Sequence, residues 1–303
     1  MKKKAIVLLT LVVQILFISP ASALLYEVFD ENDKVTSEDL LDLFEYVNIK
    51  SDKRDLESIH KIIYKNYKEG GWLYDDQTIT DKVSNNNSNG INDCLKHLGY
   101  WHEKYYKINF LFDKAVIVGF NTYDINEAIK MMIQNWHYGC RWNEIIAIGV
   151  RAKVDAFEKD ETFLSRSLSD HKSPSILNAM KYCMERQKPY FYYGLRDIPV
   201  TFIDHFSEKT DIYDQTVDAI EAWVKSADFS NIHSIAVFSV QPHSNFYDTA
   251  FKYMLKRHGH YDVFIGNLIR NTNSHIPRHL HILAKDIDLY LKMRKELGEN
   301  AFK

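Results

Sequence analysis

The sequence predicts a three-layer, doubly wound α/β fold with a mainly parallel five-stranded sheet and an N-terminal helical extension. Three observations favour this fold class. Short apolar runs alternate with amphipathic helical segments from residue 113 onward. These runs are continuously apolar, which is typical of parallel strands buried on both faces. The chain also has only 11 glycines and 6 prolines, which argues against an all-β fold with many tight turns.

Five apolar runs are the expected strands, and amphipathic helices are expected between them. The helical connections are long enough to form right-handed βαβ units, so the strands should be parallel neighbours in one sheet. The runs cover 115–120, 145–150, 198–204, 234–240 and 262–266. The helices are indicated by apolar stripes that begin at Ile125, Tyr213, Phe246 and Leu280, and by a further segment near 175–187.

Two amphipathic helices are expected before this α/β region. Thr36 and Ser37 are candidate N-caps of the first, which carries Leu40, Leu41, Phe44 and Val47 at helical spacing. The second is expected to start at Ser51, with Leu56, Ile59, Ile63 and Tyr67 on one face. Together they predict a helical hairpin that ends at Gly70-Gly71. The polar segment 84–90 predicts an exposed loop, either within one domain or at a domain boundary.

The first 23 residues have the pattern of a secretory signal peptide. Lys2, Lys3 and Lys4 precede an apolar stretch over 5–18, and Ala21-Ser22-Ala23 matches a cleavage site. The stretch is short for a membrane span of about 20 residues, although an uncleaved anchor is the alternative. We therefore expect an exported protein with no transmembrane segment after cleavage. The expected organisation is a signal over 1–23, a helical region over 24–112 packed on the main domain, and a Rossmann-like domain over 113–303.

Charge and cysteine content limit the function classes. The formal net charge of −3 gives no electrostatic case for a nucleic-acid partner. Cys94, Cys140 and Cys183 are an odd set, so they cannot all pair within one chain. Either one disulfide and a free thiol, or three buried thiols, fit this count, and a catalytic thiol is the less favoured alternative. Their spacing matches no zinc motif.

Ligands of open parallel sheets bind beyond the carboxyl ends of the strands, so polar residues that follow each expected strand are the site candidates. Helices expected near 124, 211 and 245 would also direct their N-termini to this edge, where backbone N–H groups suit an anion. The ligand-binding candidates are Asn121, Asp124, Arg151, Ser207, Thr210 and Gln241, and Asn267 and Arg270 follow the last strand. Structural alternatives exist for several: Asp124 as a helix cap, Ser207 and Thr210 as loop hydrogen-bonding groups, and Arg151 as a surface ion pair.

His243 and Asp204 are the candidate catalytic residues. His243 follows Gln241-Pro242 directly after a strand, where an imidazole can act as a general acid or base. Asp204 ends another strand, and we expect this carboxylate to orient the imidazole of His243 and to raise its pKa. A histidine that only packs or caps, and a carboxylate that only satisfies the backbone, are the structural alternatives.

Several common site motifs are missing from the sequence. No G-x-G-x-x-G follows the first strand, no G-x-S-x-G elbow is present, and no H-E-x-x-H motif occurs. His279 and His281 would point to nearly opposite sides of a helix, so they cannot share one metal ion there. We therefore expect no metal site, and the sequence identifies no cofactor.

Three segments together resemble the YdcF/SanA-like bacterial envelope proteins over about residues 113–270. They are Ala115–Asn121, an apolar run that ends in glycine and a polar turn; Ile203–Thr210, with an acidic strand end and Ser and Thr; and Phe238–His243, with a histidine shortly after the strand. This chain has Tyr213-Asp214-Gln215 where the family has an acidic–asparagine pair, and Phe246 where it has arginine. The resemblance implies an α/β fold and a bacterial protein of the cell envelope, so the exported chain is expected to be periplasmic or secreted.

Two function classes follow from these observations. One is an exported protein that acts on a small or lipid-linked anionic, phosphorylated ligand, with acid–base chemistry around Asp204 and His243. The other is a non-catalytic exported binding or interaction protein on the same scaffold. The polar residues at the strand ends favour the first, and the departures from the family pattern favour the second.

Overall fold

The computed structural model describes residues 25–47, 49, 53–68, 88–101, 109–154, 160–169, 174–270 and 276–302. The expected signal over 1–23 and the expected helix end at Gly70-Gly71 lie outside the described residues. Within them, no helix is both long enough and apolar enough to cross a membrane.

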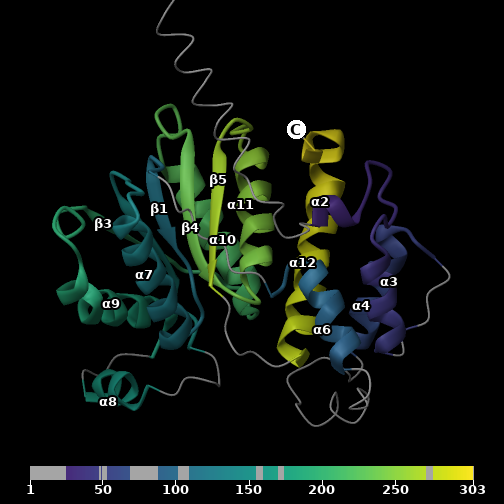
Figure 1. Cartoon of the computed structure of the whole chain (residues 1–303), viewed down its shortest axis with the longest axis horizontal. Helices are drawn as coiled ribbons and strands as arrows, with labels where there is room; N and C mark the ends of the chain where they lie inside the picture. Colours follow the sequence, from purple (N-terminus) through teal and green to yellow (C-terminus); the bar gives the residue numbers. More distant parts are fainter. Residues whose placement is uncertain are drawn as a thin grey trace, which may run out of the picture.

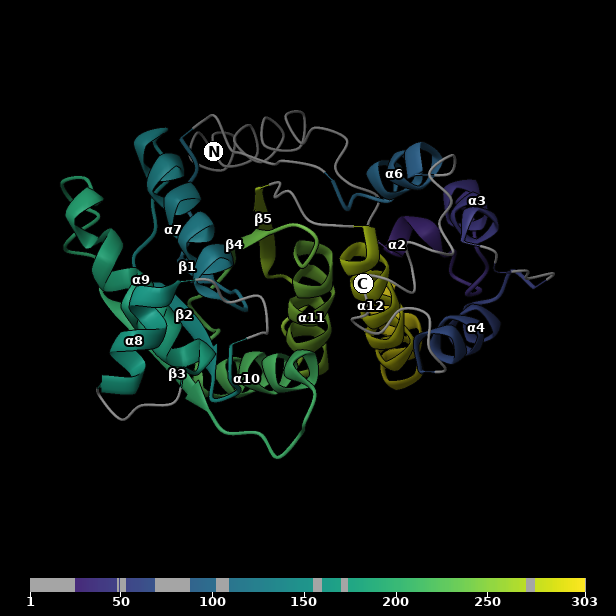
Figure 2. The same ribbon diagram turned by 90° about the horizontal axis from the view of Figure 1, so that it is seen from below.

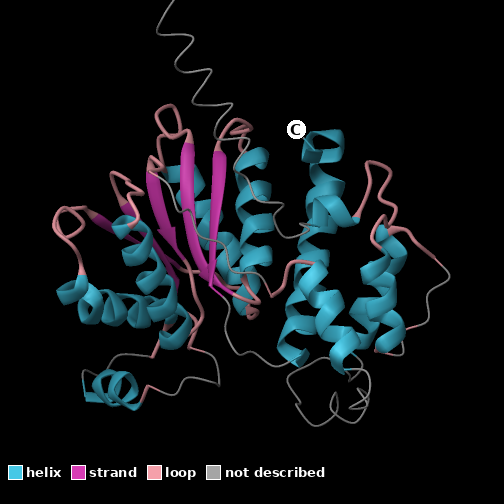
Figure 3. Cartoon of the chain, viewed as in Figure 1, coloured by secondary structure: helices cyan, strands magenta, loops and turns pink. Residues whose placement is uncertain are grey.

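All five described strands form one parallel sheet, which confirms the predicted α/β fold class (Figures 1 and 3). The strand order is β3-β2-β1-β4-β5. The strands are β1 (Lys114–Ile117), β2 (Ile145–Val150), β3 (Val200–His205), β4 (Ser234–Val240) and β5 (Phe264–Arg270). β5 continues beyond the predicted end at residue 266, because its ladder with β4 runs on to the Val240–Arg270 pair.

Helices cover both faces of the sheet. On one face lie α7 (Thr122–His137) and α9 (Ile176–Gln187), and on the other lie α10 (Ile212–Ser226) and α11 (Ser244–Arg257). The alternation along β1 places Ala115 and Ile117 in the core below α7 and α9, and Val116 in the core of the opposite face. Two shorter helices, α8 (Glu161–Ser169) and the 3₁₀ turn η1 (Lys188–Tyr190), flank α9.

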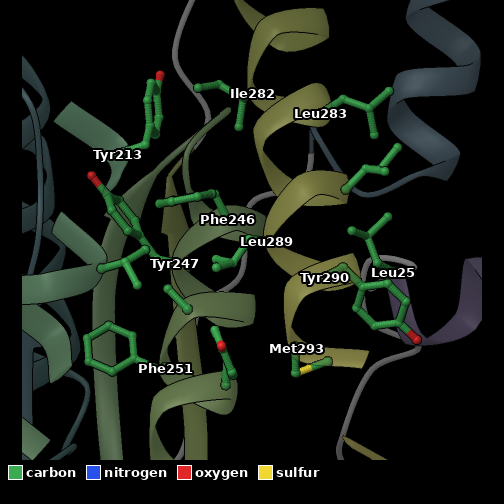
Figure 4. Packing of buried hydrophobic residues seen from close by; sticks show 14 of the residues in the cluster. Leu25, Tyr213, Phe246, Tyr247, Phe251, Ile282, Leu283, Leu289, Tyr290 and Met293 are labelled. Carbon is green, nitrogen blue, oxygen red and sulfur yellow. The ribbon is translucent and has the colours of Figure 1, made fainter. Parts of the chain in front are cut away.

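The long helix α12 (Ile276–Leu297) lies between α11 and the N-terminal helices (Figures 1 and 2). Ile282 and Leu289 point towards α11, whereas Leu283 and Tyr290 point towards the N-terminal side (Figure 4). A heptad separates the members of each pair, so each pair forms one stripe of the helix. The N-terminal helices are α2 (Leu25–Val28), α3 (Glu38–Tyr46), α4 (Leu56–Lys68) and α6 (Ser88–His97), and η2 (Gly298–Phe302) follows α12.

The predicted N-terminal hairpin is wrong in its packing. α3 packs on α6 and α4 packs on α12, rather than mainly on each other. α4 begins at Leu56 instead of Ser51 because the Asp55 carboxylate accepts the backbone N–H of Ser58 and caps the helix there.

The predicted loop over 84–90 is also wrong at its end, where Ser88 starts α6, while residues 84–87 lie outside the described residues. Gly90 lies against the ring of Tyr46, where a Cβ would come 2.5 Å from a ring carbon, so a larger residue would require the Tyr46 ring to move.

Candidate functional site

The topology has one switch point, which lies between β1 and β4. The chain moves outward from β1 through β2 to β3, then returns to the other side of β1 and continues from β4 to β5. The helices that follow β1 and β4, α7 and α11, both begin at the carboxyl edge of the sheet next to this point. Ligands of doubly wound sheets bind at such a position.

Asp124 is placed at the switch point by the start of α7. Asn121 is the N-cap of this helix, and its side-chain oxygen accepts the backbone N–H of Asp124 at 2.8 Å. Asn121, rather than Asp124, is therefore the capping residue. The Asp124 carboxylate is left to interact elsewhere, and it is buried with 1% of its side chain exposed.

The carboxylate of Asp124, the imidazole of His243 and the guanidinium of Arg278 form a single group, which we call the switch-point cluster. Nη2 of Arg278 donates to Oδ2 of Asp124 at 3.1 Å and lies 2.8 Å from Nε2 of His243. The Asp124 Oδ2 and His243 Nε2 atoms are 3.8 Å apart. Arg278 comes from the first turn of α12, so the cluster joins three helices across the switch point.

The contact with Arg278 fixes the protonation of His243. A guanidinium only donates hydrogen bonds, so Nε2 of the imidazole accepts and the ring proton is on Nδ1. Nδ1 is buried and has no hydrogen-bond partner among the described residues. Burial and the nearby Arg278 charge lower the pKa of His243 well below its ordinary value. The expectation that a carboxylate raises this pKa is therefore wrong.

Aromatic side chains enclose the His243 ring. Phe120 makes an edge contact with it at a centroid distance of 4.5 Å, and the rings of Tyr213 and Tyr247 lie somewhat further away, at 6.0 and 6.3 Å. The side chain of His243 is only 2% exposed, whereas that of Arg278 is 25% exposed. Arg278 is thus the member of the cluster whose side chain is most exposed.

The Asp204–His243 pair is not formed. Asp204 is on β3 and His243 follows β4, and β2 and β1 lie between these strands. With neighbouring strands about 4.8 Å apart, the two positions are separated by roughly 14 Å across the sheet. Asp204 instead accepts two hydrogen bonds from Arg151, from Nε at 2.8 Å and Nη2 at 3.0 Å. The Arg151 hydrogen bonds lower the pKa of Asp204, and the pair forms an exposed ion pair.

The remaining candidates have structural partners. Ser207 donates to the Asp218 carboxylate at 2.6 Å and holds the loop after β3 on α10, and Thr210 is exposed in the same loop. Arg270 forms an ion pair with Glu127 at 3.0 Å beside the start of α7. The Asn267 side chain donates to the Asp248 carboxylate.

Gln241 connects the site to the N-terminal region. Its side chain donates to the carbonyl oxygen of Gly99 at 2.8 Å, and Asn245 donates to the carbonyl oxygen of Leu98 at 3.2 Å. These two residues flank His243 in the sequence. Trp101 stacks on His279, the neighbour of Arg278, at a centroid distance of 4.3 Å. The Leu98–Trp101 segment therefore contacts the neighbours of both His243 and Arg278.

The buried carboxyl group of Asp286 also binds the Leu98–Trp101 segment. The Tyr100 hydroxyl donates to Asp286 of α12 at 2.9 Å, and both side chains are fully buried. Burial raises the pKa of Asp286 to about 7, although hydrogen bonds from Thr249 and Tyr100 oppose the shift. The carboxyl group therefore changes its protonation near neutral pH in the folded protein.

Arg278 is the site residue that the sequence analysis missed. A positive charge in the first turn of a helix is unfavourable with the helix dipole, so an arginine at that place needs a strong anionic partner. An arginine in the first turn of the expected last helix was therefore the sequence feature that could have indicated this site residue. Arg278 provides a guanidinium beside His243 from a helix that is distant in the sequence.

Other kinds of site find no support among the described residues. No group of three or more His, Cys, Asp or Glu side chains in this part of the chain is arranged to hold a metal ion. Cys94, Cys140 and Cys183 are buried thiols that form no disulfide, so the alternative with three buried thiols is the one observed. Burial raises the pKa of both Cys94 and Cys140, which disfavours the reactive thiolate.

Comparisons with protein-family models, with curated proteins and with solved structures gave no match.

Proposed function

We propose that this protein is an exported α/β protein that binds a small or lipid-linked anionic ligand at the switch-point cluster. The observation that carries the proposal is Arg278, whose guanidinium is anchored on buried Asp124 and His243 while a quarter of its side chain is exposed. A guanidinium is planar and positively charged, and it suits a phosphate or carboxylate, which it can bind through two parallel hydrogen bonds. The N-terminal ends of α7 and α11 add positive potential at the same place.

Binding is favoured over catalysis by the state of His243. Its Nε2 atom is engaged by Arg278 and its ring is enclosed by aromatic side chains. The alternative, an enzyme that uses His243 as a base, is supported by its neutral imidazole and by the unpaired Nδ1 atom. Membership of the YdcF/SanA-like family is part of the proposal, and it rests on the sequence segments alone.

The binding test is a thermal-shift screen of the chain from Leu24 with nucleotides, phosphorylated sugars and polyprenyl phosphate, followed by calorimetric titration of the hits. A bound ligand stabilises the folded state and raises the melting temperature. We expect Arg278→Gln to weaken binding at least about tenfold, since a charge-assisted bidentate contact contributes more than 1.4 kcal/mol. Arg151→Gln is the matched control, because Arg151 is also an arginine paired with an aspartate at the same edge of the sheet.

Equal losses in the two variants, or a loss only in Arg151→Gln, would place the ligand away from the switch-point cluster. Incubation of the bound ligand with wild type and with His243→Gln, followed by phosphorus NMR, decides between binding and turnover. Conversion of the ligand by wild type but not by His243→Gln would show that the protein is an enzyme. Export is tested separately by fractionation and N-terminal sequencing, with Leu24 expected as the first residue of the exported protein.

A further inference from the structure

Four exposed tyrosines lie on two segments at the amino-terminal edge of the sheet, at the opposite end of the strands from the switch-point cluster. Tyr190, Tyr192 and Tyr193 belong to the turn before β3, and Tyr138 follows α7. The exposed fraction is 68% for Tyr190, 48% for Tyr192, 97% for Tyr193 and 42% for Tyr138. His137 joins the two segments, because its ring stacks on Tyr192 at 5.1 Å and lies 6.0 Å from Tyr138. We call these four residues the tyrosine patch.

The turn that carries three of these tyrosines is well ordered by its own contacts. Arg196 donates from Nε to the carbonyl oxygen of Phe191 at 2.8 Å and from Nη2 to that of Pro189 at 3.0 Å. Phe191 and Leu195 anchor the turn in the core, and Gly194 supplies the left-handed backbone conformation with φ of +85°. The backbone is therefore fixed while the tyrosine rings extend into solvent, which reduces the entropic cost of binding a partner.

The size of the tyrosine patch limits what it can bind. At about 200 Å² per tyrosine, the four rings expose roughly 500 Å². A stable protein–protein interface needs about 800 Å² from each partner. The four rings alone thus supply less area than a stable dimer needs, and they are large enough to cover a few six-membered rings.

The chemistry of the tyrosine patch indicates a neutral, hydroxyl-rich ligand. The apolar side chains of the turn, Phe191 and Leu195, point into the core, so the exposed surface consists of rings that end in hydroxyl groups. Lys188, Arg196 and Asp197 sum to a charge of only +1, and Arg196 donates to two carbonyl oxygens of the turn, so the segment gives little attraction for a polyanion. Flat aromatic faces pack on the C–H faces of sugar rings, and phenolic hydroxyls donate and accept hydrogen bonds.

We propose that the tyrosine patch binds a neutral oligosaccharide of a few pyranose rings, with Tyr193 as the main stacking residue. The proposal does not depend on the proposed function, since the two sites are at opposite ends of the parallel strands. Tyr193 is expected to stack on the sugar because nearly all of its side chain is accessible to solvent.

The test is calorimetric titration of the chain from Leu24 with cellotetraose, maltotetraose and tetra-N-acetylchitotetraose, together with saturation-transfer NMR. Binding of at least one of them is expected, with the strongest saturation on ring C–H protons. Tyr193→Ala should weaken that binding about tenfold, whereas Tyr193→Phe keeps the ring and should stay within about threefold. Tyr261→Ala is the matched control, because Tyr261 is 40% exposed but lies outside the patch.

Three results would overturn the proposal. The first is an absence of binding to all three sugars at millimolar concentration. The second is binding that Tyr193→Ala leaves unchanged. The third is evidence that the patch binds another partner and no sugar. That evidence would be self-association, or retention on phosphatidylcholine vesicles, that Tyr193→Ala abolishes. Since Tyr193 is 97% exposed, its substitution leaves the core intact and the fold is expected to be unchanged.

Discussion

Protonation of Asp286 is expected to make the stability of this protein depend on pH in a specific direction. The pKa of this carboxyl is about 7 in the folded protein, against an ordinary value of 3.8. Between these two values the folded state holds a proton that the unfolded state has released, so stability falls as the pH rises. The full pKa shift corresponds to a change of about 4 kcal/mol in the free energy of unfolding. Roughly 3 kcal/mol of this change falls between pH 5 and pH 8.

The assay is urea unfolding at several pH values for wild type and for Asp286→Asn, which resembles the protonated side chain and does not titrate. Other ionisable groups contribute equally to both proteins, so the difference between their unfolding free energies isolates Asp286. Relative to the variant, wild type should lose roughly 3 kcal/mol from pH 5 to pH 8, with most of the change below pH 7.

The groups around Asp286 provide a second measurement. Tyr100 and Thr249 donate hydrogen bonds that lower its pKa, Asp248 raises it, and Lys252 lowers it by its charge. Tyr100→Phe removes one donor, so the midpoint of the pH dependence should move to a higher pH. Parallel stability curves for wild type and Asp286→Asn, or an unmoved midpoint in Tyr100→Phe, would refute the reasoning.

Three further predictions concern the packing that positions the site. Gly149→Ala places a Cβ 2.7 Å from the Cα of Leu177, so we expect the free energy of unfolding in urea to fall by about 1 to 3 kcal/mol. An unchanged urea midpoint would contradict the close contact of α9 with β2. Asn121→Ala removes the N-cap bond to Asp124 and should lower stability by about 1 kcal/mol, while Asn121→Asp, which can still accept the bond, should lose less. Trp101→Ala removes the ring stacked on α12 and should make the region over 25–101 more susceptible to limited proteolysis than in wild type, and an identical digestion pattern would count against this role.

The parallel sheet could be predicted from the sequence because its strands are buried on both faces. The runs around Ile145 and Ile235 are continuously apolar and short, and they are bounded by amphipathic helices, a combination that is typical of strands in a parallel sheet. The N-terminal helices were less predictable. Their apolar stripes indicate that they are helical, but a stripe does not specify its partner, and α4 packs on α12 rather than on α3.

The site was predicted only in part, for a similar reason. The carboxyl edge of the sheet contains the polar residues that follow each strand, and His243 and Asp124 do come together there. The order of strands decides which candidates meet, and it is not encoded in any local pattern. Asp204 is next to Arg151 because β3 and β2 are neighbours, and Arg278 joins His243 from a helix whose place in space depends on the whole fold.

The position of α12 has a consequence for how the chain acquires its structure during synthesis. The N-terminal helices emerge first, but the helix on which α4 packs is made roughly 200 residues later, so their contacts have a high sequence separation and form slowly. Until Leu297 has left the ribosome, the apolar stripe of α4 and the outer face of α11 both lack this shared partner. The nascent chain therefore presents two exposed apolar surfaces that a holding chaperone would recognise, and a single late helix covers both at once.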